Sequence, residues 1–211
     1  MRLRVTFAKS GAAKYSGHLD LHRTWERTLR RAGVSLAYSQ GFHPQPRIQL
    51  AAALPLGITS ECEVMDVWVE GEPDITPMLH ELHRAVPPGI EVLSLQRVDE
   101  RWPALQTQVR SAEYVITVEC DLPPHELDAR IAGLLNSGAV PRERRGKRYD
   151  LRPLVETLTR ENSDGLVQVL RMRLAAREAA TGRPEEVLAA LGLDEHPAVI
   201  HRVRIHFAEV S

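Results

Sequence analysis

Cysteine is scarce in this chain of 211 residues, which has only Cys62 and Cys120. Two cysteines cannot build a disulfide framework or a four-cysteine zinc site. They also cannot provide the three-cysteine cluster that would hold an iron–sulfur centre. We therefore expect no cofactor and a fold that depends on its apolar core.

Long hydrophobic runs are missing as well. Residues 1–7 alternate polar and apolar side chains and lack the apolar core of a signal peptide. The longest apolar stretch, around residues 48–58, is too short and too rich in proline and glycine to cross a bilayer. We also find no phosphate-loop lysine motif, Rossmann glycine triplet or nucleophile elbow. These absences predict a cytoplasmic protein with no membrane partner.

Charge of one sign is not in excess, but it is unevenly distributed. The net charge is −1, and the 43% of hydrophobic residues is typical of a globular protein. Residues 1–50 contain nine Lys and Arg against two acids, whereas residues 51–100 contain ten acids against two Arg. Either one face is built for an anionic partner, or the two stretches neutralise each other across the fold.

Hydrophobic periodicity indicates the same order of elements in both halves of the chain. The first half predicts a strand at 2–7, a helix at 19–31, strands at 47–54 and 64–70, a helix at 74–86 and a strand at 90–95. The second predicts a strand at 114–118, a helix at 123–135, a basic irregular stretch and then a strand within 140–159, a strand at 166–176, a helix at 184–191 and a strand at 199–207. The segment 98–110 has no clear period and is predicted to be a linker. The fold class is therefore α+β, with two tandem ferredoxin-like (βαββαβ) domains, 1–98 and 110–211, that have antiparallel sheets.

Several segments carry a family resemblance. They are Lys14-Tyr15-Ser16-Gly17-His18-Leu19-Asp20-Leu21, Arg31-Ala32-Gly33, Ala37-Tyr38-Ser39-Gln40-Gly41-Phe42-His43-Pro44-Gln45-Pro46-Arg47, Ala53-Leu54-Pro55-Leu56-Gly57, Ser60-Glu61-Cys62-Glu63 and the stretch from Arg145 to Leu154. The chain resembles the bacterial radical SAM-linked, or radical SAM-associated, family (domain of unknown function 2344). The resemblance implies a radical SAM protein as partner and a connection with RNA or the ribosome. It implies no settled activity.

Candidate catalytic groups are His18, Asp20 and His43. His18 and His22 are one helical turn apart and project from the same side of the predicted helix, a spacing that can also hold a metal. We expect no metal, because spacing alone is weak evidence. In the structural alternative, His18 hydrogen-bonds the adjoining loop and Asp20 stabilises the amides of the first turn.

Aromatic and basic residues form the predicted RNA-binding set. In the proline-rich loop, aromatic rings can stack on bases and Arg47 can hold a phosphate, unless the rings instead plug the end of the core. The arginines at strand spacing predict a cationic sheet face in the second domain, unless they pair with carboxylates. The full set is Lys14, Tyr15, Tyr38, Phe42, His43, Arg47, Arg145, Lys147, Arg148, Arg152, Arg171, Arg173, Arg202 and Arg204.

Three functions remain open. The first is a non-catalytic accessory protein that binds or presents RNA, or a ribosome-related substrate, to a radical SAM enzyme. The second is a metal-independent endoribonuclease of the tandem-ferredoxin type, in which histidine does acid–base work on a ribose hydroxyl. The third is a protein-interaction module without RNA binding. We favour the first.

Overall fold

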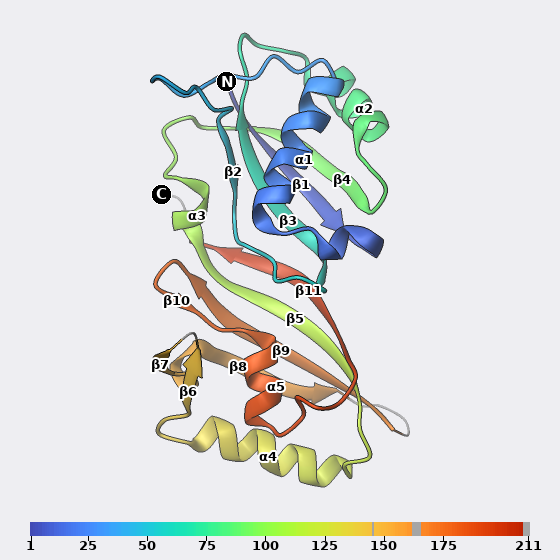
Figure 1. Ribbon diagram of the computed structural model, residues 1–211, viewed down its shortest axis with the longest axis vertical. Helices are drawn as coiled ribbons and strands as arrows, with labels where there is room; N and C mark the ends of the chain where they lie inside the picture. The colour runs from blue at the N-terminus through green and yellow to red at the C-terminus, as the bar shows by residue number, and fades with distance from the viewer. Residues whose placement is uncertain (145, 162–165, 209–211) are drawn as a thin grey trace. The chain divides into compact units, whose positions relative to one another are not determined.

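The computed structural model describes residues 1–144, 146–161 and 166–208. The chain divides into two compact units, Met1–Val109 with Ala208 and Arg110–Phe207. Each unit is a mixed α+β structure with an antiparallel sheet (Figure 1). This confirms the predicted α+β class. Among the described residues, every helix is too short or too polar to span a membrane.

The sheet of the first unit has the strand order β4–β1–β3–β2. Its strands are β1 (Arg2–Lys9), β2 (Ile48–Leu50), β3 (Thr59–Trp68) and β4 (Ile90–Val98). Helices α1 (His18–Arg31) and α2 (Ile75–Ala85) lie over one face of this sheet (Figure 1). Leu3, Val5 and Phe7 alternate along β1 and bury their side chains beneath these helices with Trp25 of α1, as their period predicts.

The opposite face of this sheet is polar and also buried. Arg2 and Arg4 of β1 both hydrogen-bond Asp66 of β3, and Arg2 also donates to the carbonyl of Trp102. The segment around α3 (Leu105–Gln108) is attached here, since the Leu105 N–H donates to the side chain of Gln49. The segment predicted to be a linker therefore packs on the sheet.

In the second unit the order is β8–β9–β5–β11, with the short β10 also paired to β9. The strands are β5 (Val109–Glu119), β8 (Val155–Glu161), β9 (Val167–Arg177), β10 (Ala180–Thr181) and β11 (Ala198–Phe207). Helices α4 (Pro124–Asn136) and α5 (Pro184–Ala190) provide apolar side chains to its core. Ile116 of β5 and Met172 of β9 are buried with Leu127 and Ile131 of α4 and Val187 of α5.

A hairpin replaces the irregular basic stretch that was predicted after α4. Strands β6 (Pro141–Arg144) and β7 (Lys147–Asp150) pair with each other, and Gly146 takes a positive φ of 74° at the turn. Hydrophobic periodicity did not predict these two strands, because charged side chains occupy most of their positions and no apolar residues alternate along them.

Candidate nucleic-acid interface

Just before α1, the chain carries a half-buried Lys14 and an exposed Tyr15. Both belong to the short 3-10 helix η1 (Gly11–Tyr15), and the Tyr15 side chain is 67% exposed. The Lys14 ammonium lies 5.2 Å from the centroid of the Tyr15 ring, a cation–π distance. The aromatic ring is therefore not used by the core and is available for stacking.

His18 and His22 are close enough to influence each other. Burial, followed by the positive charge of His22, lowers the pKa of His18 below its ordinary value of 6.5, while Glu63 opposes the shift. His18 is thus the neutral imidazole at pH 7. Within the described ranges, no three His, Cys, Asp or Glu residues gather as a metal site would require.

This lowered pKa predicts a pH-dependent stability. Below pH 6.5 the unfolded chain binds a proton at His18 more readily than the folded chain, so the free energy of unfolding should fall as the pH drops through that window. We expect the variant His18→Gln to lose part of this dependence in urea unfolding between pH 5 and 8. The exposed His80 provides the control His80→Gln, and an NMR titration of His18 at or above pH 6.5 would contradict the prediction.

The outward face of α1 carries arginines at helical spacing. Arg23, Arg27 and Arg30 are exposed and follow each other at intervals of four and three residues, which places them along one stripe. Arg30 pairs with Glu26 at 2.9 Å. No carboxylate of the described chain lies within ion-pair distance of Arg23 or Arg27. These three arginines are not in the RNA-binding set predicted above, although their spacing is visible in the sequence.

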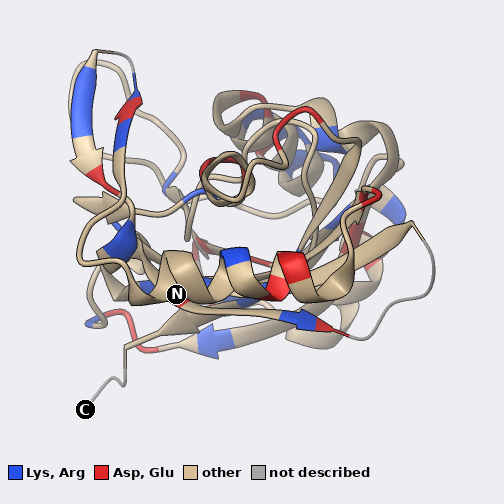
Figure 2. Cartoon of the chain, turned by 90° about the horizontal axis from the view of Figure 1, so that it is seen from below, with Lys and Arg blue, Asp and Glu red and all other residues tan. Residues whose placement is uncertain are grey.

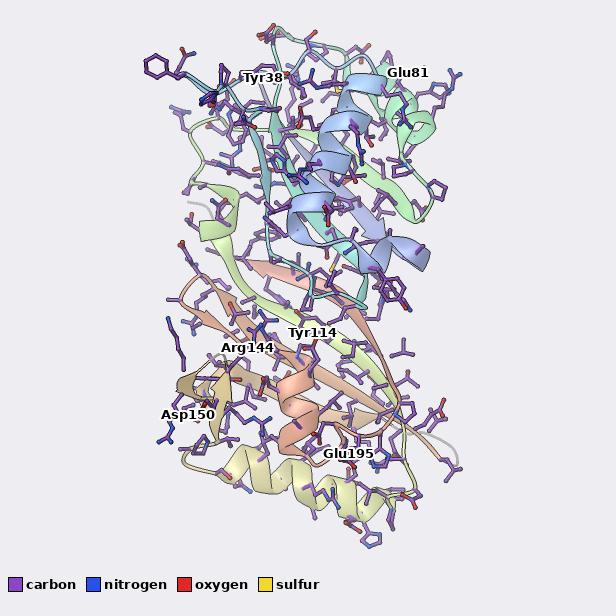
Figure 3. The ribbon with its side chains drawn as sticks, viewed as in Figure 1. Tyr38, Glu81, Tyr114, Arg144, Asp150 and Glu195 are labelled. Atoms are coloured by element: carbon purple, nitrogen blue, oxygen red, sulfur yellow. The ribbon has the colours of Figure 1, made fainter. Side chains whose placement is uncertain are left out.

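The loop after α1 is exposed and attached to the same helix. Arg30 donates a 2.7 Å hydrogen bond to the Tyr38 hydroxyl and lies 5.8 Å from the centre of its ring (Figure 3). Phe42 and His43 are exposed, with Phe42 fully so. Phe42 therefore does not plug the core, the alternative considered for this ring. Arg47 lies over the Trp68 ring at 4.4 Å.

The structure does not bring the candidate catalytic groups together. His18 begins α1, whereas the loop of His43 is attached near its other end through Tyr38. A helix of 14 residues is about 20 Å long. Asp20 is exposed in the first turn of α1, where its charge favours the free amides, in agreement with the structural alternative.

The predicted cationic face of the second sheet is largely neutralised. The Arg171 guanidinium is 2.6 Å from Glu161 and that of Arg173 is 2.8 Å from Glu156, because β8 pairs beside β9 and places its carboxylates there. Arg202 is 1% exposed, so it cannot line an open face. Arg204 alone of these four is exposed and without an ion pair in the described part of the chain.

The basic stretch between α4 and β8 is also divided. Arg152 donates to the carbonyls of Leu135 and Val155 and so has a structural role, contrary to its expected place in an RNA surface. Lys147 and Arg148 are exposed on the β6–β7 hairpin, whose two strands carry basic segments in Figure 2. Arg145 lies outside the described residues.

A group of mostly exposed basic and aromatic residues thus lies on the first unit. We call it the α1 surface and define it as Lys14, Tyr15, Arg23, Arg27, Arg30, Tyr38 and Phe42. It combines guanidinium groups, which suit phosphates, with rings at both ends of one helix, which suit unpaired bases.

Comparison with known proteins adds a family. The family model described as "Uncharacterized protein conserved in bacteria (DUF2344)" matches residues 2–184. The chain belongs to this family. The match confirms the family indicated by the motifs, and it carries no reference to radical SAM enzymes. No curated protein matches the chain.

Three solved structures show what this chain is similar to in fold. A Cbf5–Nop10–Gar1 complex matches with a TM-score of 0.56 and 10% identity, over 99% of this chain and 50% of that chain. An archaeal box H/ACA sRNP Nop10–Cbf5 complex matches at 0.50 and 13% identity, over 99% and 49%. An H/ACA RNP bound to a substrate RNA containing 2′-deoxyuridine matches at 0.50 and 10% identity, with the same coverage. The chain spans about half the length of these chains, and at such identities the likeness concerns the fold.

Proposed function

We propose that this protein is a non-catalytic accessory protein that binds RNA, or a ribosome-related substrate, through the α1 surface and presents it to a radical SAM enzyme. The observation that carries the proposal is the pair Arg23 and Arg27, which remain exposed and without a carboxylate partner in the described chain. Surface guanidinium groups usually gain some ion pairing when acids are near, as Arg30 does with Glu26. Because Arg23 and Arg27 have no carboxylate partner in the described chain, their two positive charges can pair with phosphates along one stripe of the helix.

Aromatic rings at the two ends of α1 support single-stranded RNA as the ligand. Tyr15 precedes the helix, and Tyr38 is held beside its last turns by Arg30. Rings stack on bases that are not paired, whereas a duplex hides its bases. The hydrogen bond from Arg30 also orients Tyr38 before the ligand arrives, which lowers the ordering cost of binding.

We further propose that both units are ferredoxin-like domains. The orders β4–β1–β3–β2 and β11–β5–β9–β8 place the four main strands of each unit in the same relative sequence, with a helix after the first and third of them. This supports the tandem arrangement with domains 1–98 and 110–211. The similar chains from an archaeal box H/ACA sRNP complex and from an H/ACA RNP bound to a substrate RNA support an RNA-related role for the arrangement.

Binding of a fluorescently labelled single-stranded RNA tests the α1 surface. The double variant Arg23→Glu/Arg27→Glu should lower the affinity by about tenfold or more at low salt. It should also flatten the dependence of log affinity on log salt by about 1.4, since each lost phosphate contact with a single strand contributes about 0.7. Fluorescence polarisation at several salt concentrations measures both quantities.

The matched control is Arg97→Glu/Arg101→Glu, which changes the net charge equally at exposed positions outside α1. Equal losses in both double variants would reduce the effect to net charge and overturn the α1 surface. Shortening of the labelled RNA would replace the accessory role with the endoribonuclease, and His18→Ala would then test the catalytic candidate. Recovery of a radical SAM enzyme from cells without RNA would favour the protein-interaction module.

A further inference from the structure

A basic pocket on the second unit has no part in the α1 surface. It lies between the β6–β7 hairpin and the segment that starts at β10, and its volume is about 490 Å³. Arg144, Lys147 and Tyr149 line it from the hairpin, and Arg183 lines it from the segment after β10. Figure 3 labels Arg144 and Asp150 on this hairpin.

Close packing fixes one wall of the pocket. Gly182 follows β10, and its N–H donates a 2.8 Å hydrogen bond to the Ala175 carbonyl. A Cβ at Gly182 would lie 3.1 Å from the Leu154 carbonyl oxygen and 3.1 Å from the Leu174 Cβ, tighter than ordinary van der Waals contact. Glycine therefore lets this segment approach Leu154, which contributes apolar surface to the pocket together with Ala180.

The acids near the pocket are already engaged. Asp150, which also lines it, accepts hydrogen bonds from the N–H groups of Val140 and Arg152 at 2.8 and 3.0 Å. Glu186 pairs with Arg142 at 2.9 Å. The lining thus has three cationic side chains against one carboxylate whose lone pairs are partly used.

Two of those cations are free to meet a ligand. In the ranges that the structure describes, neither Arg144 nor Lys147 has a carboxylate within ion-pair distance. Both come from the strand ends that flank the hairpin turn. Burial and the neighbouring Glu186 raise the pKa of Tyr149, so its phenol stays protonated and no phenolate repels an anion.

We propose that this pocket binds a nucleotide through its phosphate monoester. Arg144, Lys147 and Arg183 provide the positive charge that a phosphate dianion requires. The Tyr149 ring and the apolar wall of Leu154 and Ala180 accommodate the ribose or base. The volume falls in the range of about 300–1,000 Å³ that small-molecule sites have.

Calorimetric titration of the full chain tests the phosphate requirement. Uridine 5′-monophosphate and adenosine 5′-monophosphate should bind, and uridine should bind at least about tenfold more weakly, because it lacks the charge-assisted hydrogen bonds. The variant Lys147→Glu should lower the affinity for both nucleotides by about tenfold or more. Circular dichroism checks that this exposed substitution leaves the fold unchanged.

The neighbouring Arg148 provides a matched control. Its side chain is 91% exposed and it does not line the pocket, so Arg148→Glu should change the affinity by less than about twofold. Equal losses in the Lys147 and Arg148 variants, or equal binding of uridine and its monophosphate, would overturn the pocket. Neither Arg23 nor Arg27 lines the pocket. Arg23→Glu/Arg27→Glu should therefore leave mononucleotide binding unchanged, and this distinguishes the pocket from the α1 surface.

RNA oligonucleotides distinguish two sources of the same phosphate chemistry. A 5′-phosphorylated RNA that binds more tightly than its 5′-hydroxyl counterpart, with a difference abolished by Lys147→Glu, would assign the pocket to an RNA end. Mononucleotide binding without this difference would assign it to a free nucleotide. Failure of every phosphorylated ligand to respond to Lys147→Glu would refute the proposal.

Discussion

Replacement of Asp66 by asparagine is expected to lower the free energy of unfolding by about 3–5 kcal/mol, because it leaves buried charge uncompensated. Asp66 is 0% exposed and Arg2 is 1% exposed. The carboxylate accepts hydrogen bonds of 2.9 and 2.6 Å from Arg2 and of 2.8 and 3.0 Å from Arg4. An asparagine of the same shape has one acceptor oxygen and turns a donor toward a guanidinium group.

The surroundings of this triad amplify the loss. The Arg2 guanidinium lies 4.8 Å from the centre of the Trp68 ring, and that of Arg4 lies 5.4 Å from the centre of the Trp102 ring. Arg2 also donates to the carbonyls of Trp102 and Pro103 at 2.6 and 2.9 Å. Movement of Arg2 would therefore also release the segment that covers this face of the sheet.

Two further variants test whether the loss is due to the buried charge of the triad. Asp99→Asn removes a carboxylate from an exposed pair with Arg101 and should leave the free energy of unfolding nearly unchanged in the urea unfolding that also measures Asp66→Asn. The triple change of Arg2, Arg4 and Asp66 to leucine should recover part of the loss, because no buried charge remains. If Asp66→Asn and Asp99→Asn have equal effects, the buried triad is not a principal source of stability.

The triad also bears on one of the two interpretations of the uneven charge, the neutralisation of one stretch by the other. Arg2 and Arg4 belong to the basic first fifty residues, and Asp66 belongs to the acidic stretch that follows. Their pairing shows that part of the charge is neutralised inside the fold. Arg23 and Arg27 show that another part stays exposed. Neutralisation therefore holds for this triad, whereas a face built for an anionic partner stays a prediction for the exposed arginines.

The helices and strands with a clear apolar period could be predicted from the sequence. The helix expected at 19–31 is α1 at His18–Arg31, and the strand expected at 90–95 is β4 at Ile90–Val98. Periodicity identifies such elements because their buried faces are local patterns. The β6–β7 hairpin has no buried face of this kind. Its two strands pair through their backbones, and the side-chain pattern of the sequence does not indicate such pairing.

Prediction of the site was limited because the sequence does not show which carboxylate each arginine pairs with. Strand spacing correctly places Arg171 and Arg173 at alternate positions of β9. It does not reveal how β8 is aligned with β9, and this alignment brings Glu161 and Glu156 beside the two arginines. Exposure of Tyr38 and Phe42 was predictable only as one of two alternatives, because an aromatic residue at the end of a core serves either purpose. These outcomes depend on contacts between distant segments.

Replacement of Gly89 by alanine is expected to lower the free energy of unfolding by about 2–4 kcal/mol, through backbone strain and a steric clash. Gly89 has a φ of +86°, and a Cβ there would lie 2.6 Å from the Ser10 carbonyl oxygen and 2.9 Å from the Ala13 Cβ. Its own carbonyl accepts a 2.8 Å hydrogen bond from the Ser10 N–H. The sequence predicted a helix that ends at 86 and a strand that begins at 90, but not the contact of the intervening Gly89 with η1, which carries Lys14.

Gly57 separates the two causes, because its φ of +85° is nearly the same. In the described part of the chain, no atom lies within 4 Å of a Cβ built at Gly57. Gly57→Ala should therefore cost only the strain, about 1–2 kcal/mol. Because the clash at Gly89 pushes on η1, Gly89→Ala should also move the NMR amide signals of Ala13 and Lys14 and weaken RNA binding. Equal destabilisation by the two variants in urea unfolding would mean that η1 moves away from the added Cβ without a loss of stability. The contact with Gly89 would then not fix the position of Lys14 and Tyr15.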